Sequence, residues 1–242
     1  MISRTLQGED LKKSTSHRTI FEELVDSRLP PEEKSHRRLA DEAQVIISGG
    51  VETTAWTLSV AIFYIASDPA IQKRLQEELL GAFPDKAVIA NVTEYEKLPY
   101  LRACLHEALR LSYGFSGRNP RRHNKDLQFK HWTIPAGTVL TMSVMDICHD
   151  ESIFPNSTAF IPERWLGNPR APDGVALEHY FTVFGKGPRS CIGIKCVSSA
   201  YIADNQLTTK IASHGWRCIS RLACYFADIN SGFMRPMLPI HY

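Results

Sequence analysis

Apolar residues recur at helical spacing along much of the chain. The longest apolar stretch runs from Val45 to Ala66, inside a helix that we expect over Leu39–Ser67. Such a helix is about 43 Å long, because each residue adds about 1.5 Å. The same spacing predicts shorter helical segments at Arg18–Leu29, Ala70–Phe83, Thr93–Lys97, Pro99–Ser112 and near Ser143–His149.

The middle of the chain has a different pattern. Leu127–Phe129, Trp132–Ile134 and Thr138–Met142 alternate or are rich in β-forming residues, with a turn at Pro135–Gly137. Residues Phe154–Asp173 are rich in proline and asparagine, which is typical of an ordered loop. We therefore predict a mainly α fold with a small β-sheet.

The apolar stretch Val45–Ala66 is also long enough to span a bilayer. It carries Glu52 after the adjacent Gly49 and Gly50, and a carboxylate near the centre of a membrane span is costly. We therefore favour a buried helix of a soluble protein. Residues 1–38 contain no apolar run of signal-peptide length, so we expect no signal peptide and no membrane anchor in this chain.

Composition narrows the class of protein. The 242 residues are 43% hydrophobic and 22% charged, which fits a folded domain rather than a disordered chain. A formal net charge of +2 is too small to indicate nucleic acid as the main partner. The 6 cysteines are too sparse for a disulfide scaffold and include no C-x-x-C pair, so we expect reduced thiols in a cytosol-facing compartment.

One short loop carries the strongest chemical signal. Cys191 stands just before an expected helix start, where backbone N–H groups and the helix dipole stabilise a thiolate. Gly187 and Gly193 permit backbone turns and the close approach of a flat ligand. Arg189 can bind a carboxylate as a fork, and the Phe184 ring can shield the sulfur.

These five residues match the haem-binding loop of the cytochrome P450 family, F-x-x-G-x-R-x-C-x-G. The resemblance implies that Cys191 is the axial thiolate ligand of a haem b iron and that Arg189 contacts a propionate. A thiolate ligand favours O–O cleavage at such an iron. The alternative is a glycine-rich loop that holds an inert cysteine.

The long helix carries a second match. Residues 49–54, GGVETT, resemble the family's oxygen-binding helix motif [AG]-G-x-[DE]-T-T. The resemblance implies that Glu52 and Thr53 are the acid–alcohol pair that delivers protons during oxygen activation. The alternative is a helix whose small residues serve packing alone.

A third match concerns charged residues. Glu107 and Arg110 resemble the family's E-x-x-R motif, and residues 162–165, PERW, resemble its P-E-R-[FW] segment. The resemblance implies a buried structural cluster of Glu107, Arg110 and Arg164, whereas an i,i+3 pair alone is usually an exposed ion pair. Arg121 falls where the family often places another propionate contact. We interpret His149 as a hydrogen-bonded structural residue.

The resemblance covers only the second half of the family fold. The amino-acid sequences of the matching segments are most similar to those of fungal natural-product members of the family. We divide the chain into a truncated haem domain at 1–194 and an atypical tail at 195–242. The family's W-x-x-x-R motif does not occur, and we find no resemblance after Ile194. The tail can be explained by a retained intron and a shifted reading frame, because Val197-Ser198 can be encoded by a splice-donor sequence.

The resemblance implies a haem-thiolate monooxygenase that inserts one oxygen atom from O2 into an apolar small molecule of secondary metabolism. Its implied electron donor is an NADPH-dependent reductase. Full-length family members are usually anchored to the endoplasmic reticulum, and this part would face the cytoplasm. A truncated, inactive fragment is the alternative. A zinc module is a further alternative, with possible ligands Cys191, Cys196, His214 and Cys218.

Overall fold

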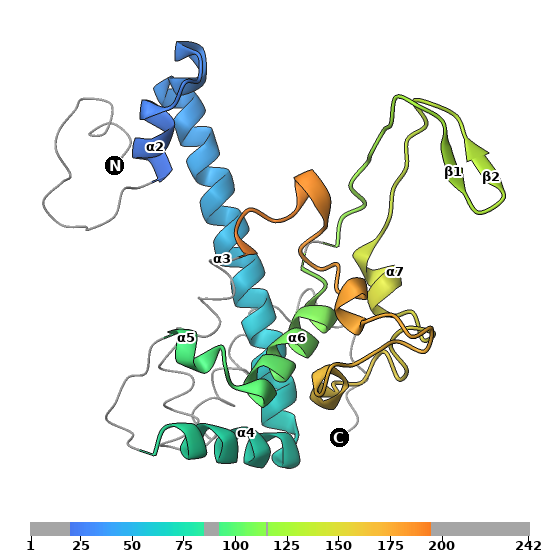
Figure 1. The fold of residues 1–242 in the computed structure, drawn as a ribbon. Helices are drawn as coiled ribbons and strands as arrows, with labels where there is room; N and C mark the ends of the chain where they lie inside the picture. Colours follow the sequence, from blue (N-terminus) through green and yellow to red (C-terminus); the bar gives the residue numbers. More distant parts are fainter. Residues whose placement is uncertain (1–19, 85–91, 115, 195–242) are drawn as a thin grey trace, which may run out of the picture. The chain divides into compact units, whose positions relative to one another are not determined.

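The computed structural model describes residues 20–84, 92–114 and 116–194 of the 242 (Figure 1). Its contacts divide the chain into two units, Met1–Glu52 and Thr53–Tyr242.

The first unit contains α2 (Ile20–Asp26), the 3-10 turn η1 (Pro31–Lys34) and the first half of α3 (His36–Ser67). α3 begins three residues before the predicted start, because Leu39 N–H donates to Ser35 O and closes the first turn. Arg38 pairs with Glu33 at 3.0 Å and with Glu42 at 2.7 Å along this segment. The Leu39 side chain is buried.

The apolar part of α3 is more exposed than predicted. Ile47 and Val51 are each 62% exposed, and only 17% of the most apolar window of the helix is buried. Within Val45–Ala66 the buried side chains lie in the second half, among them Val60, Ala61 and Ile65, so the expectation of a buried helix is wrong only for the first half. By length and composition α3 also qualifies as a candidate membrane span.

The second unit has a helical core around the end of α3. α4 (Pro69–Ala82) and α6 (Pro99–Ser112) lie beside α3 (Figure 1), and α5 (Val92–Tyr95) precedes α6. Their buried apolar side chains form one cluster: Ala61, Ile65, Ile71, Leu75, Leu79, Leu101, Cys104 and Ala108. α4 begins at Pro69 because Asp68 Oδ1 accepts the N–H groups of Ala70 and Ile71 at 2.8 and 3.3 Å.

A small hairpin follows. β1 (Leu127–Phe129) pairs antiparallel with β2 (Trp132–Ile134), as the alternating pattern predicted. The strand expected at Thr138–Met142 is wrong for the described residues. It supplies only a single bridge, Leu140 to Arg121. The fold class is nevertheless confirmed, because the described chain is mainly helical with a small two-stranded sheet.

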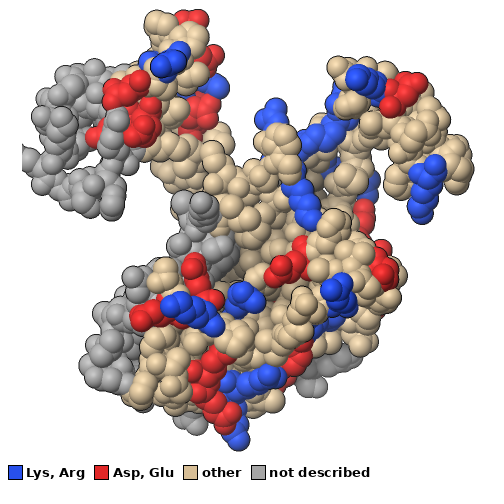
Figure 2. Space-filling view, viewed as in Figure 1, with Lys and Arg blue, Asp and Glu red and all other residues tan. Residues whose placement is uncertain are grey.

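The rest of the unit is ordered loop with short helical turns. These are α7 (Val144–Cys148), η2 (Pro162–Trp165), η3 (Leu177–Tyr180) and η4 (Gly187–Arg189). A second cluster of buried side chains packs η2 and η3 against α6: Ala103, Phe154, Trp165, Ala171 and Leu177. On the face seen in Figure 2, basic and acidic side chains are interspersed where α4 lies, rather than separated by sign.

Candidate functional site

The loop at 184–191 is closed by its own backbone. The N–H of Cys191 donates to Phe184 O at 2.7 Å, and Ser190 N–H donates to Gly187 O at 3.0 Å. Gly187 has φ +76°, a left-handed conformation in which a Cβ would be strained. The sequence pattern therefore produces a tight turn that ends at the cysteine.

The loop is anchored at its first residue. Phe184 is half-buried and packs against a cluster of buried side chains, Leu109, Cys148 and Val183. Its ring meets that of Phe181 edge-on, with centroids 6.1 Å apart. Hence α6, through Leu109, and α7, through Cys148, form a platform under the loop.

Beyond this anchor the loop is exposed. Cys191 is a free, exposed thiol, and the neighbouring Ile192 is 92% exposed. Among the described residues the Arg189 guanidinium has no hydrogen-bond or ion-pair partner, and no atom lies within 4 Å of a Cβ placed on Gly187. A soft thiol donor, an available cation for a carboxylate and open apolar surface fit a haem group.

The three charged residues of the predicted cluster lie together. Glu107 and Arg110 side chains are both 0% exposed, and Glu107 Oε1 lies 2.8 Å from Arg110 Nη2 and 3.0 Å from Arg164 Nε. Trp165 Nε1 donates to Glu107 Oε2 at 2.8 Å. Trp165 was not predicted as a partner of Glu107, although it occupies the aromatic position of the P-E-R-[FW] segment.

Arg110 has an acceptor for every N–H group. Its Nε and Nη2 donate to Glu107, Nη1 donates to Cys148 O and Ser157 O, and Nη2 also donates to Ala159 O. One carboxylate faces two guanidinium groups here, and backbone carbonyls offset the remaining positive charge. The cluster therefore fixes the residue 148–159 segment to α6.

The remaining predicted residues lie elsewhere. Glu52 is exposed and closes the first unit, whereas Thr53 is half-buried and opens the second. Arg121 is exposed, and its Nη1 donates to Pro120 O at 3.0 Å rather than to the loop that carries Cys191. Gly193 lies in the turn after Cys191, and Ile194, the last described residue, is helical. Cys196, His214 and Cys218 fall outside the described residues.

A buried polar pair connects the motif helix to α6. Thr57 Oγ1 and Ser112 Oγ lie 2.8 Å apart, and Trp56 Nε1 donates to Ser112 O at 3.1 Å. Thr53 is one helical turn before Thr57, so this pair sets the register of Thr53 against the end of α6. Nothing in the sequence pattern signalled it, because the two residues are far apart in the chain.

His149 is hydrogen-bonded, as the sequence predicted, and two cysteines lie in the core. His149 bonds to Tyr113, and burial lowers its pKa, with a smaller contribution from the Arg110 charge. Cys104 and Cys148 are buried, and burial raises the pKa of Cys148 to about 11. Within 20–84, 92–114 and 116–194, no group of three or more His, Cys, Asp or Glu residues could hold a metal ion.

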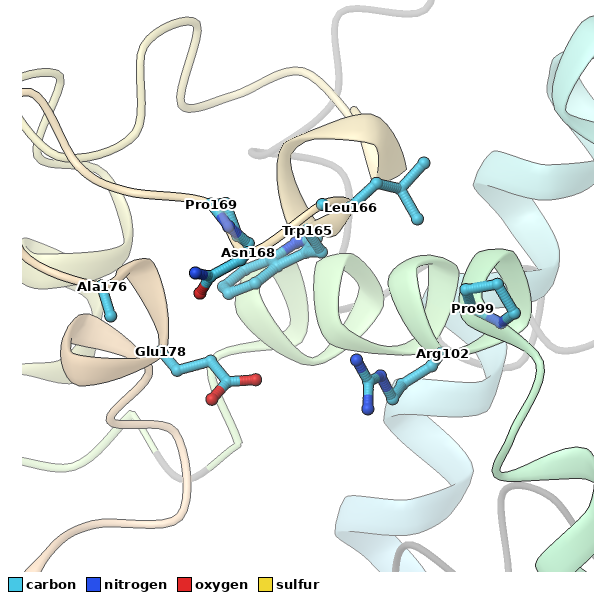
Figure 3. Close-up of a pocket in the computed structure, with 9 residues that line it drawn as sticks. Pro99, Arg102, Trp165, Leu166, Asn168, Pro169, Ala176 and Glu178 are labelled. Atoms are coloured by element: carbon cyan, nitrogen blue, oxygen red, sulfur yellow. The ribbon is translucent and has the colours of Figure 1, made fainter.

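A separate surface pocket of about 250 Å³ lies between α6, η2 and η3 (Figure 3). Arg102 and Glu178 point toward it from opposite sides, and Trp165 lies along its wall. None of the residues predicted to hold haem lines this pocket. It is therefore distinct from the loop that carries Cys191.

Comparisons with the sequences of known proteins identify the family of this chain. The sequence model of the cytochrome P450 family matches residues 4–196. The chain therefore belongs to the cytochrome P450 family, which uses haem as its cofactor.

Three similar proteins are monooxygenases from fungi. Cytochrome P450 monooxygenase sdnE of Sordaria araneosa is 49% identical over 181 residues, or 74% of this chain and 35% of that protein. Two proteins of Eupenicillium brefeldianum are also similar. Cytochrome P450 monooxygenase orf4 is 41% identical over 88% of this chain and 42% of that protein, and orf6 is 44% identical over 73% and 36%.

The chain thus spans 35–42% of the length of these relatives. The family model ends at residue 196, close to the predicted limit at Ile194. The alignment with orf4 covers 88% of the chain and therefore extends past Ile194.

Proposed function

We propose that this chain is the haem-thiolate part of a fungal cytochrome P450 monooxygenase. The observation that carries the proposal is the loop at 184–191, which presents an exposed thiol beside a guanidinium without a described partner. The full reaction inserts one atom of O2 into a C–H bond of an apolar small molecule, as in secondary metabolism. The other atom leaves as water, with two electrons from NADPH through a reductase and two protons.

The residues of this chain have distinct parts in the proposal. Haem held through the Cys191 thiolate supplies oxygen activation, because a thiolate ligand donates electron density that favours O–O cleavage. Arg189 binds a haem propionate as a charge-assisted fork. Arg121 is the second candidate for a propionate, although its guanidinium bonds to Pro120 O in the described chain.

Proton delivery is assigned to α3. Thr53 Oγ1 would hold a proton for oxygen activation, and the Glu52 carboxyl group would replenish it from solvent as a general acid. The exposure of Glu52 supports its access to solvent protons. The cytosolic side of the endoplasmic reticulum membrane is the proposed location, by analogy with the family.

A second candidate is a chain that binds haem weakly or not at all and does not turn over. The exposed side chains of Ile47 and Val51 favour it, because water that reaches the motif helix allows unproductive proton delivery. The two candidates differ in turnover, and the first requires a Cys191 thiolate ligand.

Spectroscopy on the full 242-residue chain tests the proposal. We expect that haem reconstitution, dithionite and carbon monoxide give the strongly red-shifted Soret band of cysteinate coordination, and that Cys191→Ser abolishes it. Cys104→Ser is the matched control, because Cys104 is buried in the cluster between α3, α4 and α6 rather than against the loop. An identical spectrum for wild type and Cys191→Ser contradicts the proposal. Product formation with NADPH and a reductase then separates turnover from haem binding alone.

A further inference from the structure

α6 ends in a backbone conformation that is unusual for its residue. Tyr113 has φ +62°, and its N–H donates to Leu109 O at 3.2 Å. A left-handed conformation at a residue with a side chain is unfavourable, so neighbouring contacts must hold Tyr113 in place.

The turn at Tyr113 touches the segment that leads to the cysteine. A Cβ placed on Gly114 would lie 2.9 Å from Val183 O, so the two backbones are in close contact. Val183 precedes Phe184, whose carbonyl accepts the Cys191 N–H. A shift of the Tyr113–Gly114 turn therefore displaces the first residue of the cysteine loop.

A chain of hydrogen bonds leads away from Tyr113. Tyr113 Oη lies 2.5 Å from His149 Nε2, His149 Nδ1 lies 3.3 Å from Ser157 Oγ, and Ser157 Oγ donates to Glu151 Oε1 at 2.7 Å. The ionised carboxylate only accepts, so the Ser157 hydroxyl donates to it and accepts from His149 Nδ1–H; in the neutral imidazole, Nε2 is then the acceptor. Hence His149 Nδ1–H donates to Ser157, and Tyr113 O–H donates to His149 Nε2.

The far end of this chain is itself held firmly. Glu151 also accepts the N–H groups of Asn156 and Ser157 at 2.7 and 2.9 Å. Ser157 O accepts Arg110 Nη1 at 2.6 Å. Two residues of α6 therefore hold the 149–157 segment: Arg110 in the last turn of the helix and Tyr113 at its C-terminal cap.

We propose that Tyr113 and His149 are positioning residues for the Cys191 loop, which they hold in register through the Gly114–Val183 contact. The assignment of Cys191 as haem ligand rests on the proposed function. The positioning of the loop does not, and it is measurable in the chain without haem.

Amide hydrogen exchange of residues 183–192 in the haem-free, full-length chain provides the test. Tyr113→Phe removes one hydrogen bond, and we expect exchange at the Cys191 amide to become about five- to tenfold faster by local opening. Tyr100→Phe is the matched control, because Tyr100 lies at the other end of α6 and its Oη bonds to Glu163 at 3.0 Å. In the Tyr100→Phe variant, the amide exchange rates of residues 183–192 should equal those of the wild type.

A second variant keeps the test independent of Tyr113. Ser157→Ala interrupts the chain at its middle and should also speed exchange in 183–192, whereas Ser152→Ala, which removes a bond to Asp150, should not. Equal exchange in 183–192 for Tyr113→Phe and Tyr100→Phe overturns the proposal. Uniform acceleration over the whole chain also overturns it, because that result reflects global unfolding.

The haem-loaded chain adds a spectroscopic readout. We expect Tyr113→Phe to lose part of the red-shifted carbon monoxide band, while Tyr100→Phe keeps it. If Cys191→Ser leaves the spectrum unchanged, the proposed function fails. The positioning proposal is then still decided by the exchange data.

Discussion

At the scale of single residues, Glu107 connects several segments of the second unit through its carboxylate group. Its two carboxylate oxygens accept bonds from both arginines, from Trp165 Nε1 and from the Ile161 N–H at 3.0 Å. A buried ion pair gains little over a well-packed apolar pair, but removing one partner leaves uncompensated charge in the interior.

Glu107→Gln should therefore be strongly destabilising. The change leaves Arg110 and Arg164 without an anion, and we expect a loss of about 3–5 kcal/mol in the free energy of unfolding. Urea denaturation measures it. Glu77→Gln is the control: Glu77 is exposed and pairs with Lys73 at 3.9 Å, and its loss should cost less than about 1 kcal/mol. Equal effects of the two changes would show that burial of Glu107 is unimportant.

The sequence identified these charges only through motif resemblance. An i,i+3 glutamate and arginine predicts a shared helix face, yet nothing in the local pattern says that the face is buried. The Thr57–Ser112 pair was not predictable at all, because polar residues in two helices give no signal of mutual contact.

At the scale of elements, α6 begins with help from another helix. Leu98 provides no side-chain cap, and Pro99 has no N–H group. Glu78 of α4 accepts the next two N–H groups, those of Tyr100 at 2.7 Å and Leu101 at 2.8 Å. A carboxylate at a helix N-terminus satisfies these donors and interacts favourably with the helix dipole.

Glu78→Gln should weaken the start of α6. We expect a loss of about 1 kcal/mol, because the amide cannot accept both N–H groups and lacks the charge. Amide exchange at Tyr100 and Leu101 should accelerate, whereas Glu77→Gln on the neighbouring position should leave it unchanged. Unaltered exchange at Tyr100 in Glu78→Gln would contradict the capping interpretation.

Element prediction succeeded where the local pattern decides the outcome. The bounds of α6, β1 and β2 agree with the sequence analysis, because proline starts the helix and alternation marks the hairpin. It failed at Thr138–Met142, where β-forming residues met no partner strand beyond one bridge with Arg121. A segment forms a strand only when a neighbouring strand pairs with it, and the local sequence does not show whether such a strand is present.

At the scale of the whole molecule, exposed and buried titratable groups make stability depend on pH. Burial lowers the pKa of His149, and hydrogen bonds from Ser157 lower that of Glu151. In both cases the unfolded chain binds protons more readily than the folded chain, so stability falls as pH decreases.

We therefore expect the urea midpoint to fall between about pH 7 and 5, the range in which an unfolded histidine gains its proton. His149→Gln should flatten this part of the profile, because glutamine does not titrate. His131→Gln, at the exposed hairpin turn, is the control. A wild-type midpoint that rises as pH falls would contradict the sign of the His149 effect.

The helical architecture and family could be predicted from the whole sequence, whereas the exposure of α3 could not. A continuous apolar run indicates burial, but it does not say which residues bury it. Ile47 and Val51 are uncovered in the described residues, although the pattern predicted an interior helix.

The contacts of Arg110 also constrain the order in which α6 and residues 148–159 fold. Its five N–H groups find their acceptors in Glu107, on its own helix, and in Cys148, Ser157 and Ala159. Water must solvate this guanidinium until the later segment arrives, since desolvation without those carbonyls is prohibitive. α6 can therefore coil early, but it can dock only when residues 148–159 close over it, so the two parts become native in one concerted event.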